Sequence, residues 1–286
     1  MSQPPATGLA HSVQTRLKNA ATLTGRPFAE LLELYAVERF LHRLGRSPHR
    51  DRFVLKGALL LRHWLGAETR PTRDIDLLGP ADLDASALRS AIVDVLSTKT
   101  EDDAVAFAAK SIVVRPIRAG SAVLGLRAKF DATLGRVRLR YQVDVGLGDA
   151  IFPREVEIVP GGLLGMPMSS VRAYTVYTTL AEKLEAVVVL GGANSRTKDY
   201  YDLSALPRAL ALDGSILAES IRQTFARRAT VVPAAPLEGL NDDFASVVAA
   251  IREFAEPVLA AVRDGRPFDW NWPPGGPWSP QPTELP

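Results

Sequence analysis

The sequence has 286 residues, 47% of them hydrophobic, so it is long enough to bury the core of one or two domains. Its 34 basic residues nearly balance its 32 acidic ones, so overall charge does not decide for or against a nucleic-acid partner. The lack of cysteine excludes disulfides, zinc–thiolate sites and thiol catalysis. With no signal-peptide core and no membrane-length apolar run, we expect a cytoplasmic protein without a membrane partner.

The first third of the chain is predicted to alternate helices and short strands. Residues 10–45 carry apolar side chains near a helical period and are predicted to be helical. A short strand is expected at residues 53–55, after which Gly57 should turn the chain into a helix. Residues 73–79, RDIDLLG, alternate polar and apolar side chains as a strand does. Residues 84–97 are predicted to form a helix with an aspartate near its start.

The next region is predicted to be rich in β-strands. The segments KSIVVRPIR, AVLGLRAKFDA and GRVRLRYQVDVGLG are three strand candidates, and a hairpin through ATLG could join the last two. The third segment alternates clearly, so its side chains should divide between two faces. The apolar face would carry Val137, Leu139, Tyr141, Val143 and Val145, and the polar face Arg136, Arg138, Arg140, Gln142 and Asp144.

The second half is predicted to be mostly helical. A helix that begins at Thr175 should end at Gly191-Gly192, because glycine favours helix C-termini. The segment SRTKDYYDL starts another helix, with Asn194 or Ser195 as its cap. Two more helices are predicted within residues 214–228 and 241–262.

The tail after the last helix is rich in proline and tryptophan. Its prolines should prevent regular structure, and its tryptophans could hold it against the body of the protein. The chain is therefore expected to be an α/β protein, with a mixed-sheet domain at residues 1–160 and a helical domain at residues 161–286.

Two aspartates stand two residues apart in the strand RDIDLLG. Asp74 and Asp76 share one face, with Cβ atoms about 6–7 Å apart, because side chains alternate along a strand. Their oxygens suit Mg²⁺, which binds a few carboxylates together with substrate phosphates. Asp144 is the natural third member, and three strand-borne aspartates suit nucleotidyl transfer with two metal ions. Taken alone the pair is weak evidence, because aspartates also cap turns and pair with arginines such as Arg73.

The segment LKGALLL precedes these aspartates. Gly57 opens a helix there, and the free backbone N–H groups at a helix start could hold a phosphate. Lys56 is either a second phosphate contact or a solvated lysine, and the sequence leaves both possibilities open.

A second charged cluster follows about a hundred residues later. Lys183 stands beside the apolar stripe of LAEKLEAVV, where a lysine is usually an edge residue with its charge in water. In NSRTKDYYDL, Arg196 and Lys198 lie near a helix start, where anions bind, and Asp199 and Asp202 share a face. In isolation, capping and an ordinary Lys198–Asp202 pair would explain this motif.

The motifs FVLKGALLL, RPTRDIDLLG, YQVDVGL, AEKLEAVV and SRTKDYYDL together resemble the AbiEii/AbiGii-type nucleotidyltransferases. These are toxins of toxin–antitoxin and phage-abortive systems in the polymerase-β-like superfamily. The order and approximate spacing agree over residues 30–205. The resemblance implies a polymerase-β-like mixed sheet flanked by helices, followed by a helical half that completes the active site.

The resemblance also implies a role for each matching residue. The residues expected to be catalytic are Asp74, Asp76, Lys183 and Asp199, and those expected to bind metal are Asp74, Asp76 and Asp144. Those expected to bind the nucleotide are Lys56, Gly57, Arg196, Lys198 and Asp202. Related proteins often have Gly-Gly or Gly-Ser where this chain has Gly57-Ala58, so a serine hydroxyl is replaced here while the backbone N–H groups remain.

The acceptor of the nucleotide is predicted from local charge. Eight basic residues and one acid, Asp131, lie between Lys110 and Arg140. Arg136, Arg138 and Arg140 would share a strand face with Asp144 and contact RNA, although a solvated outer face would look the same. Some toxins of the family add nucleotides, often pyrimidines, to the 3′ end of tRNA. The resemblance thus implies an NTP as the donor, with a pyrimidine preferred, and Mg²⁺ as the cofactor. It also implies a tRNA acceptor whose modification blocks translation, and an antitoxin partner.

Three other functions stay open. The enzyme could modify a small molecule or a protein hydroxyl, although the basic strand argues against this. It could be a non-catalytic module that binds RNA or an antitoxin, although all the expected catalytic side chains are present. It could also transfer a phosphoryl group to the antitoxin or to itself, with Thr72 near the aspartates.

Overall fold

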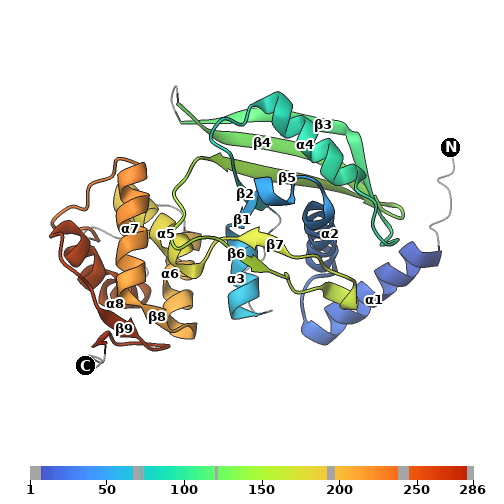
Figure 1. Cartoon of the computed structure of the whole chain (residues 1–286). Coiled ribbons are helices and arrows are strands. Elements are labelled where there is room, and N and C mark those ends of the chain that lie inside the picture. Colours follow the sequence, from blue (N-terminus) through green and yellow to red (C-terminus); the bar gives the residue numbers. More distant parts are fainter. Residues whose placement is uncertain are drawn as a thin grey trace, which may run out of the picture. The chain divides into compact units, whose positions relative to one another are not determined.

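The computed structural model describes residues 8–66, 72, 74–119, 122–191, 197–237 and 245–281. The chain forms two compact units, shown in Figure 1. The sheet unit comprises Met1–Gly148 and Val156–Ala173, and the helical unit comprises Asp149–Glu155 and Tyr174–Pro286. The chain therefore passes between the units three times, where one boundary near residue 160 was expected. Among the described helices, none has the length and apolar character that crossing a membrane requires.

The sheet unit contains a seven-stranded mixed sheet in the order β3-β4-β5-β2-β1-β7-β6 (Figure 1). β2 runs parallel to β5 and β1 runs parallel to β7, while the other neighbours are antiparallel. This confirms the expected mixed α/β fold. The strands are β1 (Val54–Lys56), β2 (Ile75–Gly79), β3 (Val105–Ala119), β4 (Ala122–Leu134), β5 (Val137–Leu147), β6 (Val156–Ile158) and β7 (Val171–Ala173).

The helix predicted over residues 10–45 is divided into two. Gly25 has a φ of +69°, and Pro27 caps the second helix, so the chain leaves helical geometry between them. Asp84 caps the helix predicted after it by accepting a hydrogen bond from the backbone N–H of Ala87. The helices of the sheet unit are α1 (Gly8–Thr24), α2 (Phe28–Arg46), α3 (Ala58–Leu65) and α4 (Ala85–Ser97), with short 3₁₀ turns at Arg50–Arg52 and Leu163–Gly165.

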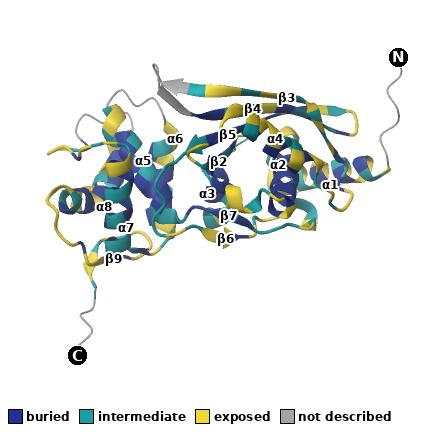
Figure 2. Cartoon of the chain, turned by 45° about the horizontal axis from the view of Figure 1, so that its top comes forward, coloured by how far each residue is buried: buried dark blue, intermediate teal, exposed yellow. Residues whose placement is uncertain are grey.

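Strand β5 alternates as its sequence predicts. Tyr141 and Val143 are buried, and the ring of Tyr141 lies 6.1 Å from that of Phe130 on β4, centroid to centroid. The ring of Phe40 on α2 stacks on that of Phe130 with centroids 5.8 Å apart, and α4 packs on β3 and β4. Buried and exposed residues accordingly follow one another along these strands in Figure 2. The opposite face, which carries Arg138 and Arg140, is left to solvent.

One strand prediction was wrong in detail. Arg136 was expected to share a strand face with Arg138, but it lies with Gly135 in the turn between β4 and β5. The pairing of Leu134 with Val137 closes this hairpin, and a φ of +60° at Gly135 makes the tight reversal possible.

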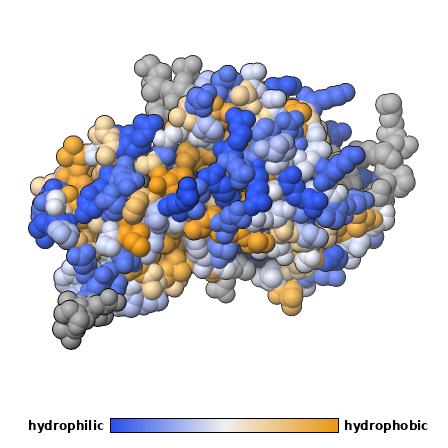
Figure 3. Space-filling view, viewed as in Figure 1, coloured by the Kyte–Doolittle hydropathy of each residue, from blue (hydrophilic) through white to orange (hydrophobic). Residues whose placement is uncertain are grey.

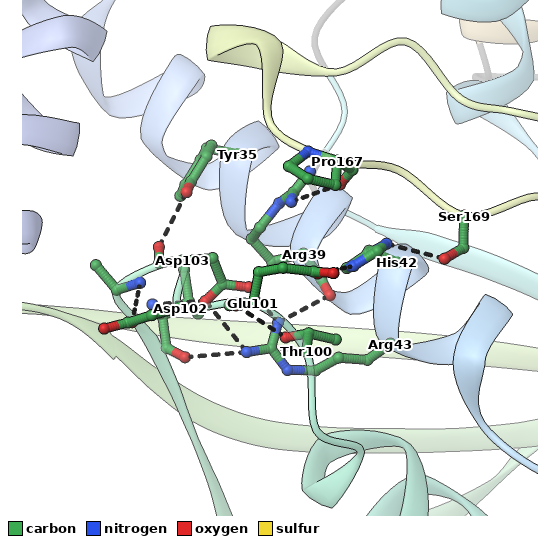
Figure 4. Close-up of polar contacts among 12 residues, drawn as sticks. Tyr35, Arg39, His42, Arg43, Thr100, Glu101, Asp102, Asp103, Pro167 and Ser169 are labelled. Carbon is green, nitrogen blue, oxygen red and sulfur yellow. Dashed lines mark hydrogen bonds and ion pairs between the residues drawn. The ribbon is translucent and has the colours of Figure 1, made fainter.

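Helix α2 is tied to distant segments by buried polar groups, shown in Figure 4. The guanidinium of Arg43 donates to both carboxylate oxygens of Asp103, at 2.6 and 3.1 Å. The Tyr35 hydroxyl donates to the Asp103 carbonyl at 2.9 Å, and Arg39 donates to the Pro167 carbonyl at 2.8 Å. Both nitrogens of His42 also have partners, Glu101 and Ser169.

We predict that Arg43→Met lowers the free energy of unfolding by about 3–5 kcal/mol, because it leaves the buried Asp103 carboxylate without its cation. Urea unfolding measures the loss. Arg46→Met is the matched control, since Arg46 lies on the same helix in an exposed pair with Glu101 and its loss should change stability little. Equal effects of the two substitutions would contradict this view of α2.

The described residues of the helical unit form four helices and a small sheet. The helices are α5 (Val176–Leu190), α6 (Thr197–Ala209), α7 (Gly214–Arg227) and α8 (Ala245–Arg263). Thr175 caps α5 by accepting from the backbone N–H of Thr178, while the caps predicted for α6, Asn194 and Ser195, lie outside the described residues. The small sheet has the order β10-β9-β8, formed by β8 (Leu212–Asp213), β9 (Trp270–Trp272) and β10 (Ser279–Pro280).

The tryptophans hold the tail against the helices, as predicted. The indole N–H of Trp272 donates to the Pro207 carbonyl, and that of Trp278 donates to the Phe254 carbonyl, both at 2.7 Å. Both rings also contact the Phe254 ring, with centroids 5.1 and 5.6 Å apart. The expectation that prolines prevent regular structure was wrong at β9 and β10, where short edge pairings still form.

Candidate active site

Charged residues form a row across four neighbouring strands of the sheet unit. In the strand register, Lys56 of β1 pairs with Asp76 of β2, Asp76 with Asp144 of β5, and Asp144 with Arg127 of β4. Neighbouring strands lie about 4.8 Å apart, so each residue is close to the next. We call these four residues the charged row. Its two central carboxylates are flanked by a cation at each end.

Arg127 binds the carboxylate of Asp144 with two parallel hydrogen bonds. Its Nε and Nη2 atoms donate to the two oxygens at 2.8 and 2.7 Å. The amide of Gln142 adds a third donor at 3.2 Å. The hydrogen bond to Asp144 raises the pKa of Arg127, and the charges of Asp74 and Asp76 contribute to the rise. All three aspartates therefore act on one guanidinium, and the bidentate pair fixes Asp144 in place.

Strand β2 begins at Ile75, so it contains Asp76 as predicted, whereas Asp74, which was expected inside the strand, lies just before it. Asp76 is half-buried within the strand, Asp74 is exposed just before it, and Ile75 between them is fully buried. The described residues hold no group of three or more His, Cys, Asp or Glu close enough to bind a metal ion by themselves. Mg²⁺ typically uses one or two carboxylates together with substrate phosphates, so a pair of aspartates fits such an ion. Asp144 is less open to a metal, because Arg127 occupies both of its oxygens.

Gly57 brings the start of α3 against the Asp76 carboxylate. It has a φ of +75° and stands at the N-cap of α3, as the sequence predicts. A Cβ atom at this position would lie 2.2 Å from Asp76 Oδ2 and 2.8 Å from Asp76 Cβ. Only glycine fits here, and it leaves backbone N–H groups of a helix start beside a carboxylate-lined surface.

We predict that Gly57→Ala costs more stability than Gly66→Ala. Gly57 caps the start of α3 and Gly66 caps its end, with φ values of +75° and +79°. An alanine at either position therefore adds backbone strain of about 1–3 kcal/mol. A Cβ at Gly66 meets nothing within 4 Å, whereas one at Gly57 collides with Asp76. Urea unfolding of the two variants isolates the collision. Equal losses would show that Asp76 moves away freely and that the close approach is unimportant.

The second cluster lies wholly within the helical unit. Lys183 Nζ on α5 is 3.0 Å from Asp199 Oδ1 and 2.5 Å from Asp202 Oδ2, both on α6. Asp202 is fully buried, and the Lys183 and Asp199 side chains are 13% and 16% exposed. Lys183 is therefore not a solvated edge residue. Lys198 is exposed on α6, and Arg196 lies outside the described residues.

A neighbouring cluster gave no signal in the sequence. Arg228, just after α7, forms ion pairs with Asp149 at 3.2 Å, Glu182 at 3.1 Å and Glu185 at 2.8 Å. Burial acts to lower the pKa of Arg228, but the surrounding carboxylates raise it overall. Glu182 and Glu185 stand on either side of Lys183 in sequence, so this network orients the same helix, α5.

We predict that Lys183→Met lowers the free energy of unfolding by about 3–5 kcal/mol, because it removes the ammonium group that pairs with the buried Asp202 carboxylate. Urea unfolding measures this loss, and the double variant Lys183→Met/Asp202→Asn should recover much of it. Lys198→Met is the matched control on the exposed side of α6 and should unfold like the unmodified protein. A double variant as unstable as the single one would contradict the proposed pairing.

The comparisons with known proteins agree on one family. Residues 39–272 match the family described as nucleotidyl transferase AbiEii toxin, type IV toxin–antitoxin system. The chain belongs to the AbiEii nucleotidyltransferase toxin family. This membership makes it a toxin-type nucleotidyltransferase with an antitoxin partner and confirms the resemblance seen in the sequence. No curated protein sequence matches the chain.

The fold resembles that of a solved nucleotidyltransferase toxin. The AbiEii chain resembles MenT4, a nucleotidyltransferase toxin from Mycobacterium tuberculosis H37Rv, with a TM-score of 0.59 and 14% identity over 88% of this chain and 89% of that one. JHP933 from Helicobacter pylori gives a TM-score of 0.38 and 11% identity over 83% of this chain and 93% of that one. At these identities the likeness to MenT4 concerns the fold.

The structure gathers the predicted site residues of this AbiEii toxin into two sets. Lys56, Gly57, Asp76 and Asp144 come together in the sheet unit, where Asp74 lies just before Asp76. Lys183, Asp199 and Asp202 come together in the helical unit. Arg127 was counted in the sequence only among basic residues, and its place opposite Asp144 depends on strand register. Each set is held by its own unit.

Proposed function

We propose that this toxin transfers a nucleoside monophosphate from an NTP to the 3′ end of an RNA, with Mg²⁺ as cofactor. A tRNA is the proposed acceptor, its modification would block translation, and a pyrimidine NTP is the proposed donor. The charged row is the observation that carries the proposal, since it sets two carboxylates beside a glycine-initiated helix start. Hard oxygen ligands next to backbone N–H donors suit a metal-bound triphosphate.

Each set of residues has a proposed task. Asp74 and Asp76 would hold Mg²⁺, which when bound neutralises charge on the triphosphate. The backbone N–H groups that follow Gly57 would donate to phosphate oxygens. Lys183 would contact the triphosphate, and the buried Asp202 would keep its ammonium group in position. Asp199 is proposed as catalytic, and Lys198 and Arg196 as nucleotide contacts.

The proposed transfer is a displacement at the α-phosphorus. The acceptor hydroxyl oxygen forms a bond to that phosphorus, and the bond from phosphorus to the bridging oxygen breaks. Pyrophosphate leaves with that bonding pair, and the hydroxyl proton passes to water. The residues of the chain contribute by holding the reacting groups in line and by offsetting charge, which are the main tasks in phosphoryl transfer.

The exposed arginines of β5 support a polyanionic acceptor. Arg138 and Arg140 lie on the same face of the strand as Asp144, and that face is not covered by α2 or α4. Positive charge that continues from the charged row, at Asp144, suits an RNA better than a small neutral substrate. Arg136 lies at the hairpin end of this strand, where it can extend the same basic surface.

We predict that the protein labels RNA when it is incubated with Mg²⁺, total RNA and each α-labelled NTP in turn. Asp74→Asn and Asp76→Asn should each reduce labelling about a hundredfold or more, because the proposed metal contacts are lost. Asp82→Asn is the control, since Asp82 is an exposed carboxylate of the same unit outside the charged row.

Three outcomes would contradict this function. Absence of labelled RNA with all four NTPs would reject RNA as the acceptor, and label in protein or in a small molecule would identify the alternative acceptor. Full activity of both asparagine variants would reject the role assigned to the two aspartates.

A further inference from the structure

A groove crosses the outer face of strands β3, β4 and β5 in the sheet unit. Its volume is about 690 Å³, within the roughly 300–1,000 Å³ that is usual for ligand sites. Strand β3 is irregular beside the groove, where its register against β4 shifts between Ala108 and Val113. Ser111 stabilises this irregularity, because its hydroxyl donates to the Ala108 carbonyl at 2.7 Å and accepts from the Asp131 backbone N–H at 2.8 Å.

The groove is lined by cations from all three strands. Four basic residues, Arg115, Arg127, Lys129 and Arg140, line it together with a single carboxylate, Asp131. Arg140 pairs with Asp131 at 3.2 Å. Arg115 and Lys129 are exposed and have no described carboxylate within ion-pair distance. The groove therefore carries excess positive charge that a polyanion could offset.

Apolar residues line the groove beside the cations. Val113, Pro116 and Ile117 come from β3, an edge strand of the sheet, where Arg115 stands between them. Val113 is 51% exposed and is the strand partner of Lys129. Single apolar residues at a surface are ordinary, and Figure 3 shows apolar patches among hydrophilic residues on the face it presents. Three apolar residues interspersed with cations along one groove are a more specific arrangement.

The groove ends at the charged row. Arg127 belongs to both, since it lines the groove and binds the carboxylate of Asp144. Arg115 is the strand partner of Arg127, and Asp144 is the strand partner of Asp76. The cations of the groove therefore continue, strand by strand, into the carboxylates proposed to hold Mg²⁺, all within the sheet unit.

We propose that this groove binds the single-stranded 3′ segment of the RNA acceptor, with phosphates against Arg115, Lys129 and Arg140 and bases against Val113, Pro116 and Ile117. The inference rests on the proposed function and adds the acceptor subsite to it. A single strand exposes both its phosphates and the faces of its bases, and it fits a groove whose lining combines basic and apolar side chains. A duplex hides its base faces and would leave the apolar residues without a partner.

The test is fluorescence anisotropy with a labelled single-stranded RNA oligonucleotide and with the same sequence as a duplex. Single-stranded RNA should bind more tightly than the duplex. Arg115→Glu and Lys129→Glu should each weaken single-strand binding at least about tenfold and reduce its dependence on salt. Arg89→Glu is the charge control, because Arg89 is exposed on α4, which packs on the other face of the sheet, and this variant should bind as the unmodified protein does.

A second matched pair of variants tests the apolar residues of the groove. Val113→Asp should weaken single-strand binding, whereas Val156→Asp should not, since Val156 is 43% exposed on β6 at the opposite edge of the sheet. Circular dichroism of each variant shows whether it has folded, and Lys129→Gln offers a milder change at the same position.

The outcomes separate this inference from the proposed function. If the protein labels RNA but the groove variants bind and label it normally, the groove assignment is wrong and the proposed function stands. Equal affinity for duplex and single strand would also overturn the assignment. If the protein neither binds nor labels any RNA, the acceptor class and the groove assignment both fail.

Discussion

The electrostatic constraint on Asp76 and Asp144 governs the sheet unit. Two carboxylates at paired positions of neighbouring strands, which lie about 4.8 Å apart, repel each other unless positive charge is near. Arg127 supplies it through a bidentate pair with Asp144. The chain approaches Asp76 so closely at Gly57 that no side chain fits between them. The parallel pairing of β2 with β5 sets the two carboxylates side by side, Arg127 binds one of them, and the turn into α3 lies against the other.

The helical unit meets a similar constraint with a lysine. Asp202 is fully buried, and a carboxylate without a cation would be costly there, so Lys183 is held in place by a group that is itself inaccessible. Asp199, on the same lysine, keeps partial exposure and is the member that can respond to a ligand. The Arg228 network holds α5 from the other side. A buried anchor and an accessible partner are what a pre-organised nucleotide contact requires.

Much of the fold and several of the site residues could be predicted from the sequence, because they depend on patterns within short segments. The periodicity of β5, the turn at Gly57 and the motif order all predicted what the structure and the family match show. Arg127 could not be found in this way, because its place opposite Asp144 depends on register across a hairpin. Arg228 was equally hidden, since its partners come from two segments far from it in sequence, Asp149 and helix α5. The position of Arg136 was missed by one residue, at the point where a strand becomes a turn.

The most direct test is a crystal structure with Mn²⁺ and a non-hydrolysable NTP analogue, read by the anomalous signal of the metal. The account predicts metal about 2.0–2.2 Å from carboxylate oxygens of Asp74 and Asp76, with a phosphate at the N-terminus of α3. It also predicts that Arg127 stays paired with Asp144. Metal and nucleotide bound away from the charged row, with Asp76 still packed on Gly57 and touching neither, would contradict it.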